Sequence, residues 1–482
     1  SGAEESRSGA DAVGWDSGPV APAAAGTVQA AEETASAPPV EENKFKIHAR
    51  ARMRAGLWTK RLDVQPLAQA RASLDVNGSY ATDGRVAGMP ASFRLKAGLH
   101  TDYDAAYLVH RDLYDRPTLD AYRSRTYMRE TLLGGTIGAL SLTFGRQVIT
   151  LGQGEVLGLV DVLNARDLRE PGLTEPEDLR LPVLTTRVGL RLGKLSVEGF
   201  VVHESNYGFF PPPMGTLSPF NRLISENELV GTALGERGVS LRHEPRGFSP
   251  ELWQYLARAS YWWAGLDMEF YGGSVLDRLG VTALPPAEAF AGDAVSILLY
   301  HPRYTLLATS GSLAIDNFLV RYELAAELDR PLATMVRREA NLLDFGYVRR
   351  SLVGAMLGVT YFGNVGTNAG IELQRETLLS SAPQASSGQT LLWPVENLTL
   401  ALRLSQDLAR ETLQLRVLAM VMGFAPFNGA FARVDLAYTL LDGLKAELGY
   451  IAYFSSEHFG PFYGFDRHDR AQFTVTWDFN VR

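Results

Sequence analysis

Hydrophobic and polar residues alternate one by one along much of the chain. In residues 45–57 every odd position is apolar, and the even positions up to Arg54 are Lys, His or Arg. Because successive side chains of a β-strand point to opposite faces, this segment has one apolar and one charged face. The alternation recurs at 93–100, 318–328, 398–404, 413–421, 430–440, 444–454 and 471–482. The pattern predicts an all-β protein.

The connections between the predicted strands are short at one end and long at the other. Leu441-Asp442-Gly443 has the glycine that a tight hairpin turn requires, whereas 151–183, 205–234 and 276–303 are long. Short turns at one end and long loops at the other are typical of transmembrane antiparallel up-and-down β-barrels. We expect about 18 strands (16–18), centred near 51, 72, 97, 127, 144, 188, 200, 239, 270, 307, 320, 355, 373, 400, 416, 435, 449 and 476.

Residues 245–264 fit the strand pattern less well. Ser249-Pro250-Glu251 resembles the start of a helix, and apolar residues follow at helical spacing from Leu252 to Trp263. We therefore expect a helix or a long turn on the periplasmic side of the barrel.

Two other fold classes fit the sequence less well. A soluble β-sandwich or propeller would show similar alternation, but its inner faces would not hold rows of arginine, and no 40–50-residue blade repeat is visible. A transmembrane helix requires about 20 predominantly apolar residues. The longest uncharged run, 351–371, is interrupted by five glycines and two asparagines.

Composition separates a tail from the barrel. Residues 1–42 carry eight acidic side chains and one basic, so most of the net charge of −8 lies there. This stretch is rich in Ala, Gly, Ser and Pro, which predicts a disordered tail over 1–43 and a barrel over 44–482. The tail could contact a periplasmic partner, and we expect that a signal peptide has already been removed. The acidic balance argues against nucleic acid as a partner, and the absence of cysteine excludes disulfides and thiolate chemistry.

A motif begins in the strand "FGRQVITLGQGE" and continues through 161–182. It comprises Gly145, Arg146, Gln147, Asn164, Asp167, Pro171, Gly172, Leu181 and Pro182. In this motif the chain resembles a bacterial outer-membrane β-barrel family of unassigned function, with weaker similarity over about 45–482. The resemblance implies a Gram-negative outer-membrane location, a large barrel architecturally similar to alginate-export-type and porin barrels, and no enzymatic activity. Arg482 departs from the aromatic residue with which such barrels usually end.

If the apolar faces contact outer-membrane lipid, a row of basic side chains faces the lumen. These are Lys46, His48, Arg50, Arg52, Arg54, Arg71, Arg94, Lys96, Arg123, Arg125 and Arg129. Anion-selective pores use such rows, because a low-dielectric wall focuses the field of the cations. The alternative is that these cations pair with acidic residues of an inward-folded segment, and both can hold.

Segment 151–182 is the candidate for that inward fold, because it is too long for a hairpin loop and rich in turn residues. We expect Asn164, Arg166, Asp167 and Arg169 to line a constriction. The alternative is a loop that covers the outer rim.

We therefore predict a channel for anionic or amphipathic solutes, with export of an acidic polysaccharide as one form of this function. The alternative is a plugged barrel that anchors partner proteins. A third hypothesis is a hydrolase at the rim that uses His458 or His468. We expect no cofactor and no metal, since the histidines lack ligand spacing and "GQGEVLG" is not a dinucleotide-binding motif.

Overall fold

A computed structural model describes most of the chain after residue 44. The described residues are 45–63, 65–226, 238–283, 295–337, 343–379, 389–391, 396–424, 427–456 and 460–481. The predicted tail over 1–43 lies outside them.

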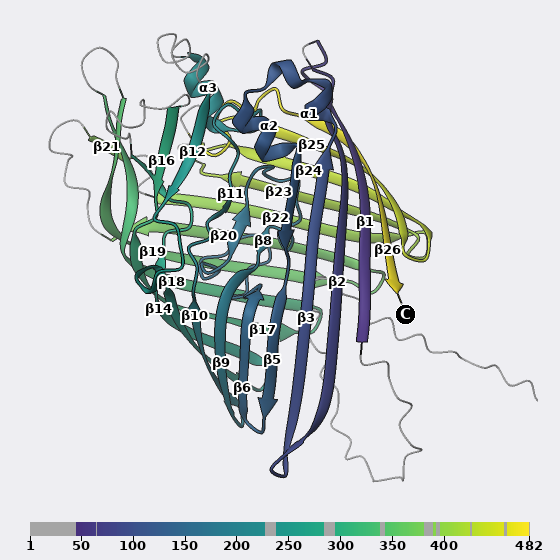
Figure 1. The fold of residues 1–482 in the computed structure, drawn as a ribbon, viewed down its shortest axis with the longest axis vertical. Coiled ribbons are helices and arrows are strands. Elements are labelled where there is room, and N and C mark those ends of the chain that lie inside the picture. The colour runs from purple at the N-terminus through teal and green to yellow at the C-terminus, as the bar shows by residue number, and fades with distance from the viewer. Residues whose placement is uncertain are drawn as a thin grey trace, which may run out of the picture. The chain divides into compact units, whose positions relative to one another are not determined.

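The described residues form one closed antiparallel barrel of 18 strands, in which each strand pairs with its neighbours along the chain and β1 closes on β26 (Figure 1). β4 and β5 both pair with β3 and together make one spanning strand, and β21 (Gln389–Leu391) only extends the end of β18. The barrel strands are β1 (Phe45–Trp58), β2 (Leu67–Val86), β3 (Met89–Asp104), β4 (Ser124–Met128), β5 (Thr131–Ile137), β6 (Leu140–Gln147), β9 (Val183–Leu192), β10 (Leu195–Val202), β13 (Gln254–Trp263), β14 (Leu266–Leu276), β17 (Arg303–Ile315), β18 (Phe318–Arg337), β19 (Leu343–Phe362), β20 (Thr367–Leu378), β22 (Glu396–Leu408), β23 (Leu413–Met422), β24 (Ala430–Leu441), β25 (Leu444–Phe454) and β26 (Arg470–Val481).

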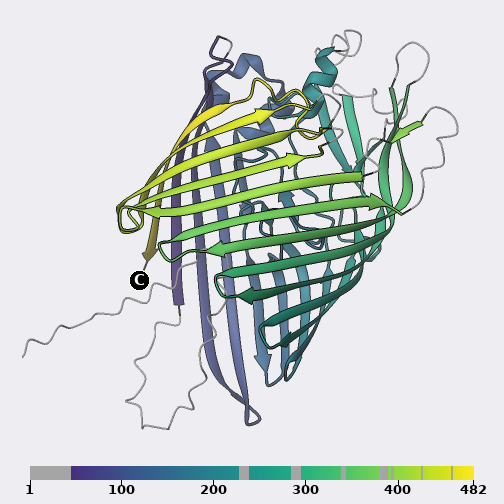
Figure 2. The same ribbon diagram turned by 180° about the vertical axis from the view of Figure 1, so that it is seen from behind.

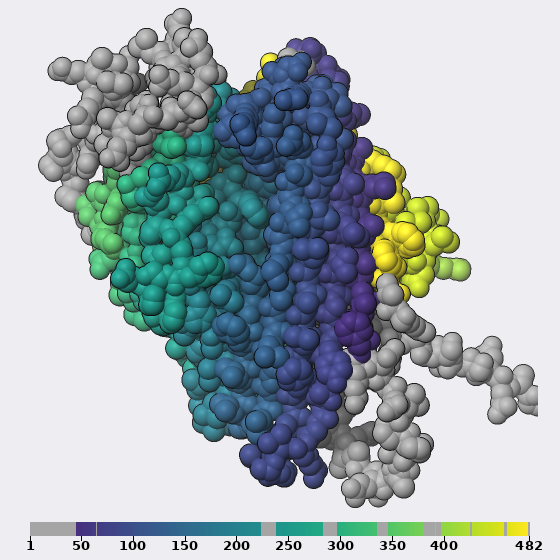
Figure 3. Space-filling view, viewed as in Figure 1, coloured from purple at the N-terminus to yellow at the C-terminus, as the bar shows by residue number. Residues whose placement is uncertain are grey.

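The strand register separates apolar from charged side chains as the alternation predicts. In β1 the inward Arg50 lies opposite Asp75 of β2 and Asp478 of β26. Apolar side chains on the other face stay exposed, such as Leu448 at 61% and Trp477 at 53%. An exposed apolar outer face on a closed barrel is suited to contact with lipid. The purple and blue N-terminal strands form a continuous part of this outer wall (Figure 3).

The long connections gather at one end of the barrel and carry the remaining elements (Figure 2). By analogy with other membrane barrels we take this end as extracellular. The remaining elements are α1 (Ala106–Val109), η1 (Arg111–Leu113), α2 (Arg116–Tyr122), β7 (Ala165–Asp167), β8 (Arg180–Leu181), β11 (Gly208–Phe209), α3 (Pro219–Glu226), β12 (Val239–Glu244), η2 (Pro250–Leu252), β15 (Val281–Ala283) and β16 (Val295–Tyr300). In the part of the chain that the structure describes, no helix has the length and apolar character needed to cross a membrane.

The predicted number of strands is confirmed, but two segments were wrongly assigned. The strand predicted near 239 is β12, which pairs with β16 outside the barrel. The helix or long turn predicted over 245–264 contains β13, which spans the barrel between β10 and β14. Outward residues such as Tyr255 and Trp263 alternate with inward Arg258. Over so short a stretch, apolar residues that repeat every two positions also fall three or four positions apart. The segment therefore fitted a helix as well as a strand, and the helix was predicted wrongly.

Candidate functional site

Residues 148–182 connect β6 to β9 through the interior of the barrel, and we call them the lumen segment. β7 and β8 of this segment form a small sheet with β11. Its polar groups contact β2 and β4 on one side of the barrel, β18 and β20 on the opposite side, and β24 on the wall between them. β18 and β20 lie opposite β2 and β4 in the strand order, so the segment crosses the lumen between these walls (Figure 1).

Two carboxylates of the wall hold the backbone of the lumen segment. Glu323 of β18 accepts hydrogen bonds of 2.6–3.2 Å from the backbone N–H groups of Gln153, Gly154, Leu159 and Val160. Glu372 of β20 accepts bonds of 2.6–2.9 Å from those of Glu155, Val156 and Leu157. Both side chains are almost fully buried, at 0% and 3% exposure. Hydrogen bonds to a charged group contribute about 1.5–3 kcal/mol each, so these two residues fix the segment's path.

Glycines allow the backbone to wrap around these carboxylates. Gly152 adopts a φ of 78°, and a Cβ there would lie 2.2 Å from Oε1 of Glu323. A Cβ at Gly154 would lie 1.6 Å from the carbonyl oxygen of Leu157. The "GQGEVLG" sequence is therefore a turn that binds carboxylates. A side chain at Gly152 would clash with Glu323, and one at Gly154 would clash with the backbone of the turn.

A buried aspartate organises the next part of the segment. Asp161 accepts hydrogen bonds from Asn164 at 3.0 Å, Arg166 at 2.7 Å and Arg180 at 2.8 Å. Burial alone would raise the pKa of Asp161, but the guanidinium groups of Arg166 and Arg180 hold it well below its usual range. Asp161 is therefore ionised and bonds to both adjacent strands of the small sheet, β7 and β8.

The other acidic residues of the lumen segment pair with arginines of the wall. The pairs are Glu155–Arg321, Asp167–Arg125, Glu170–Arg71, Glu175–Arg433, Glu177–Arg403 and Asp178–Arg52. Part of the wall's positive charge is thus neutralised inside the barrel, as the alternative interpretation of the basic row supposed.

The predicted basic row divides into paired and unpaired cations. A carboxylate partner is present for His48, Arg50, Arg52, Arg71, Lys96, Arg125 and Arg129. Among the described residues no carboxylate pairs with Lys46, Arg54, Arg94 or Arg123. Of these, Lys46, Arg54 and Arg94 lie on the inward face of β1 and β3, and Arg123 is the C-cap of α2 at the extracellular end.

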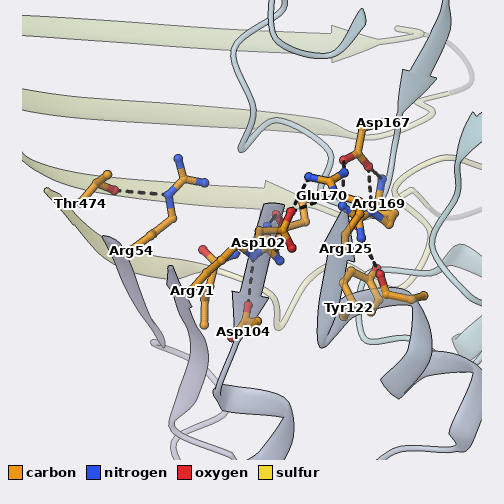
Figure 4. A network of polar contacts seen from close by, with 12 residues as sticks. Arg54, Arg71, Asp102, Asp104, Tyr122, Arg125, Asp167, Arg169, Glu170 and Thr474 are labelled. Carbon is orange, nitrogen blue, oxygen red and sulfur yellow. Dashed lines mark hydrogen bonds and ion pairs between the residues drawn. The ribbon is translucent and has the colours of Figure 1, made fainter. Parts of the chain in front are cut away.

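Arg54 is the unpaired member of the basic row that lies beside the ion pairs of Glu170 (Figure 4). Its Nε donates to Thr474 Oγ1 at 3.3 Å, and its register neighbour in β2 is Arg71. Arg71 already shares Glu170, at 2.7 Å, with Arg470, at 3.8 Å. Figure 4 shows Arg54 set apart from the cluster around Glu170. One guanidinium therefore remains in excess at this level of the wall.

The residues predicted to line a constriction all lie in the lumen segment, but they differ in exposure. Asn164 is fully buried and bonds the backbone of Ile149, and Arg169 is 3% exposed and pairs with Asp167. Arg166 and Asp167 are half-buried. Asn164 and Arg169 thus support the segment, while contact of Arg166 and Asp167 with a solute stays a prediction.

The rim histidines of the hydrolase hypothesis can be placed only in part. His458 lies outside the described residues. His468 is buried against Trp58 and contacts Arg61 at 3.1 Å, and burial lowers its pKa to about 4. The adjacent Asp469 is bonded to the backbone of Tyr453 and to Lys60. Within the described ranges no group of three His, Asp or Glu residues could hold a metal ion.

The sequence analysis did not identify Glu323 and Glu372 as functional residues. In the sequence they are ordinary polar positions of alternating strands, and their backbone partners lie 170 and 217 residues away. The only local signal was the glycine spacing in the lumen segment, which indicates close approach of another group but does not identify it.

Comparison with known proteins bears on the fold. No family model and no curated protein matches the chain. Among solved structures, Acinetobacter baumannii OccAB3 aligns with 91% of this chain and 99% of its own at a TM-score of 0.50 and 12% identity. The outer membrane protein OpdK of Pseudomonas aeruginosa aligns with 91% of this chain and 99% of its own at a TM-score of 0.48 and 11% identity.

At these identities the likeness concerns the fold alone, a large closed antiparallel β-barrel. The 18-stranded barrel and its apolar outer face make the chain a β-barrel protein of the Gram-negative outer membrane.

Proposed function

We propose that this protein is an outer-membrane channel for small anionic solutes. The observation that carries the proposal is that four cations of the predicted basic row have no carboxylate partner among the described residues. These are Lys46, Arg54, Arg94 and Arg123. Such cations attract anions in a lumen whose low-dielectric wall focuses their field. Arginine also binds carboxylates and phosphates through paired hydrogen bonds.

The four cations lie at different depths, three of them on the wall formed by β1 and β3. Arg123 is at the extracellular end, Arg54 lies beside the lumen segment, and Lys46 and Arg94 lie toward the short-turn end of β1 and β3. An anion that enters from outside thus meets successive cations on its way inward. Phe209 packs against Arg125 and Arg169, each 5.2 Å from its ring centre, and gives the path an apolar surface for amphipathic anions.

Small solutes are favoured over an acidic polysaccharide. A polymer needs a continuous bore along its length, and the lumen segment crosses the bore between opposite walls. Export of a polymer would require this segment to leave its position and to break its hydrogen bonds to Glu323 and Glu372.

The second candidate is a plugged barrel that anchors partner proteins. The observation in its favour is the number of ion pairs between the lumen segment and opposite walls, for example Glu170–Arg71 and Glu155–Arg321. This candidate predicts a correctly folded barrel that conducts no ions.

The experiment compares purified wild type with the variant Lys46→Gln/Arg54→Gln/Arg94→Gln in planar bilayers across a salt gradient. We expect an anion-selective wild type and a shift of the reversal potential toward cations in the variant. The control is Arg349→Gln, which removes an exposed arginine at the extracellular rim, and it should keep wild-type selectivity. Unchanged selectivity in the triple variant contradicts the proposal, and silence of a folded wild type favours the plugged anchor.

A further inference from the structure

Three guanidinium groups surround one carboxylate at the extracellular side of the lumen segment. Arg166 of β7 and Arg180 of β8 bond to Oδ2 of Asp161 at 2.7 Å and 2.8 Å. Arg278 donates through Nη1 to the backbone carbonyl oxygen of Asp161 at 2.5 Å. Arg180 is close to the start of β9 and Arg278 to the end of β14, both at the end of the barrel with the long connections. We call Arg166, Arg180 and Arg278 the arginine cluster.

The charges of the arginine cluster are not balanced within the lumen segment. Arg166 and Arg180 lie directly opposite each other in the register of β7 and β8, where two like charges repel. Asp161 supplies a single negative charge, which both of them share. Among the described residues no other carboxylate pairs with either arginine. One positive charge therefore remains in excess before Arg278 is counted.

Arg278 adds a second excess charge. In the described part of the chain its hydrogen-bond partner is an uncharged carbonyl group, and its buried Nε has no partner. The adjacent Asp277 is engaged with Arg330 at 3.7 Å and with the backbone N–H of Gly280 at 2.8 Å. Burial lowers the pKa of the Arg278 guanidinium to about 9, and the neighbouring Arg166 acts in the same direction. A bound anion would raise this pKa again and stabilise the charged form.

The arginine cluster also has hydrogen-bond donors that no protein group uses. Each guanidinium has five N–H donors, and Arg180 engages only Nε within the described ranges, which leaves both of its Nη groups. Nε of Arg166 is buried without a partner, as is Nε of Arg278. The side chains of Arg166 and Arg180 are 22% and 16% exposed, so a small solute can reach them. The cluster therefore suits a ligand with two negative charges and several acceptor oxygens.

We propose that the arginine cluster binds the phosphate group of a small solute that enters from outside. A phosphate group carries about two negative charges near neutral pH and has three strong acceptor oxygens, so it matches both the excess charge and the unused donors. Arginine suits phosphate because its planar group donates two parallel hydrogen bonds. A single carboxylate would neutralise only one of the two charges. The inference deepens the proposed function and rests on it for the route by which the solute reaches the cluster.

The test measures binding of inorganic phosphate to the purified full chain in detergent at pH 8 by isothermal titration calorimetry. We expect Arg180→Gln and Arg278→Gln each to weaken binding by about tenfold or more, since each removes charge-assisted hydrogen bonds. Arg278→Lys should bind more tightly than Arg278→Gln, because it keeps the charge. The control is Arg187→Gln on β9. Arg187 pairs with Glu198, so its charge is already neutralised and the variant should bind like wild type.

Two further anions test the class of ligand. Acetate, with one charge, should bind wild type about tenfold or more weakly than phosphate does. Succinate carries two charges on separate planar carboxylates, and binding equal to that of phosphate would overturn the assignment to phosphate. Equal phosphate binding by wild type, Arg180→Gln and Arg278→Gln, with all three barrels folded by heat-dependent gel mobility, would overturn the site itself.

Calorimetry separates this inference from the proposed function, because it detects binding whether or not ions pass. An anion-selective channel whose phosphate affinity is the same in wild type and in both glutamine variants would overturn the site and leave the proposed function intact. A folded barrel that binds phosphate through Arg180 and Arg278 but conducts no ions would support the site and contradict the proposed channel.

Discussion

Two walls of the barrel carry charge of opposite sign and use it differently. The basic wall, formed by β1–β5, presents arginines such as Arg54 and Arg94 that have no carboxylate partner among the described residues. The acidic wall, formed by β18–β20, presents Glu323 and Glu372, which are fully engaged with backbone N–H groups of the lumen segment. The acidic wall therefore holds structure in place, and the basic wall keeps charge that a solute can meet.

This difference shows that the number of charged residues on a wall does not give the charge that a solute meets in the lumen. Glu372 also lies 3.6 Å from Arg321, which pairs with Glu155 of the lumen segment. Counter-charges and amides thus neutralise the acidic wall locally. Only cations left after this pairing, such as Arg54, can favour anions over cations.

The largest effect is expected from Glu323→Gln/Glu372→Gln. Each amide places an NH₂ group where backbone N–H groups now donate to a carboxylate oxygen, so donor faces donor. The lumen segment should lose its fixed path, and single-channel conductance should rise several-fold with more frequent current fluctuations.

A neighbouring carboxylate supplies the matched control. Glu327 lies on the same wall and pairs with Arg330, and no hydrogen bond joins it to the lumen segment within the described ranges. Glu327→Gln should leave conductance near wild type. If both variants behave alike, the anchoring role of Glu323 and Glu372 is wrong.

Gly154→Ala tests the same interaction, between Glu323 and Glu372 and the backbone of the lumen segment, by a change in the lumen segment itself. The added Cβ would lie 1.6 Å from the Leu157 carbonyl oxygen, so the turn around the carboxylates must distort. Strain of this kind costs about 1–3 kcal/mol and should lower the thermal stability of the barrel and raise current noise. Gly199→Ala, whose Cβ would meet nothing within 4 Å, should show neither change.

A smaller effect is expected from Arg54→Gln alone. A solvated unit charge about 6 Å from a passing anion contributes about 0.7 kcal/mol, which corresponds to about a threefold change in the anion-to-cation permeability ratio. Reversal potentials in a salt gradient measure this ratio. Arg54→Lys should retain it, and a drop as large as that of Arg54→Gln would indicate that geometry rather than charge is required.

Lowering the pH should destabilise the region around β12 at the extracellular end and leave the anion selectivity of the channel nearly unchanged. His243 of β12 donates to His301 at 3.0 Å, and Tyr207 stacks on His301 with ring centres 3.4 Å apart. Burial lowers the pKa of His243 to about 4 and that of His301 to about 3. In the unfolded state both histidines take up protons below about pH 6.5, whereas in the folded state they stay neutral to a lower pH. The free energy of unfolding of this region therefore falls as pH decreases from about 6.5 toward 4.

The expected loss at pH 5 is about 2 kcal/mol per histidine. Hydrogen exchange of residues 239–244 at pH 7.5 and pH 5, corrected for intrinsic rates, measures it. His301→Gln should flatten this pH dependence. Protection that does not change with pH would show that the two imidazoles do not stabilise this region.

The barrel was predictable from the sequence because each strand carries its own evidence. Alternation in 45–57 or 471–482 depends only on residues within the strand, and burial on one face fixes its register. The error at 245–264 arose where η2 (Pro250–Leu252) precedes β13 and the local pattern fitted both helix and strand.

The candidate site was predictable only in part, for a different physical reason. The basic row could be identified because its members share one face of nearby strands. Which cations remain unpaired depends on partners far away in the chain, such as Glu175 for Arg433, 258 residues apart. The same holds for Glu323, whose role is defined by backbone amides of another element and not by its own sequence neighbours.

The most direct test of the account is the reversal potential of the single wild-type channel across a tenfold gradient of potassium chloride. The account predicts stable openings whose reversal potential lies on the chloride side of zero. Among the described residues the basic wall keeps unpaired cations, and the carboxylates of the acidic wall are engaged. A reversal potential on the potassium side, or a folded barrel without current, would contradict it.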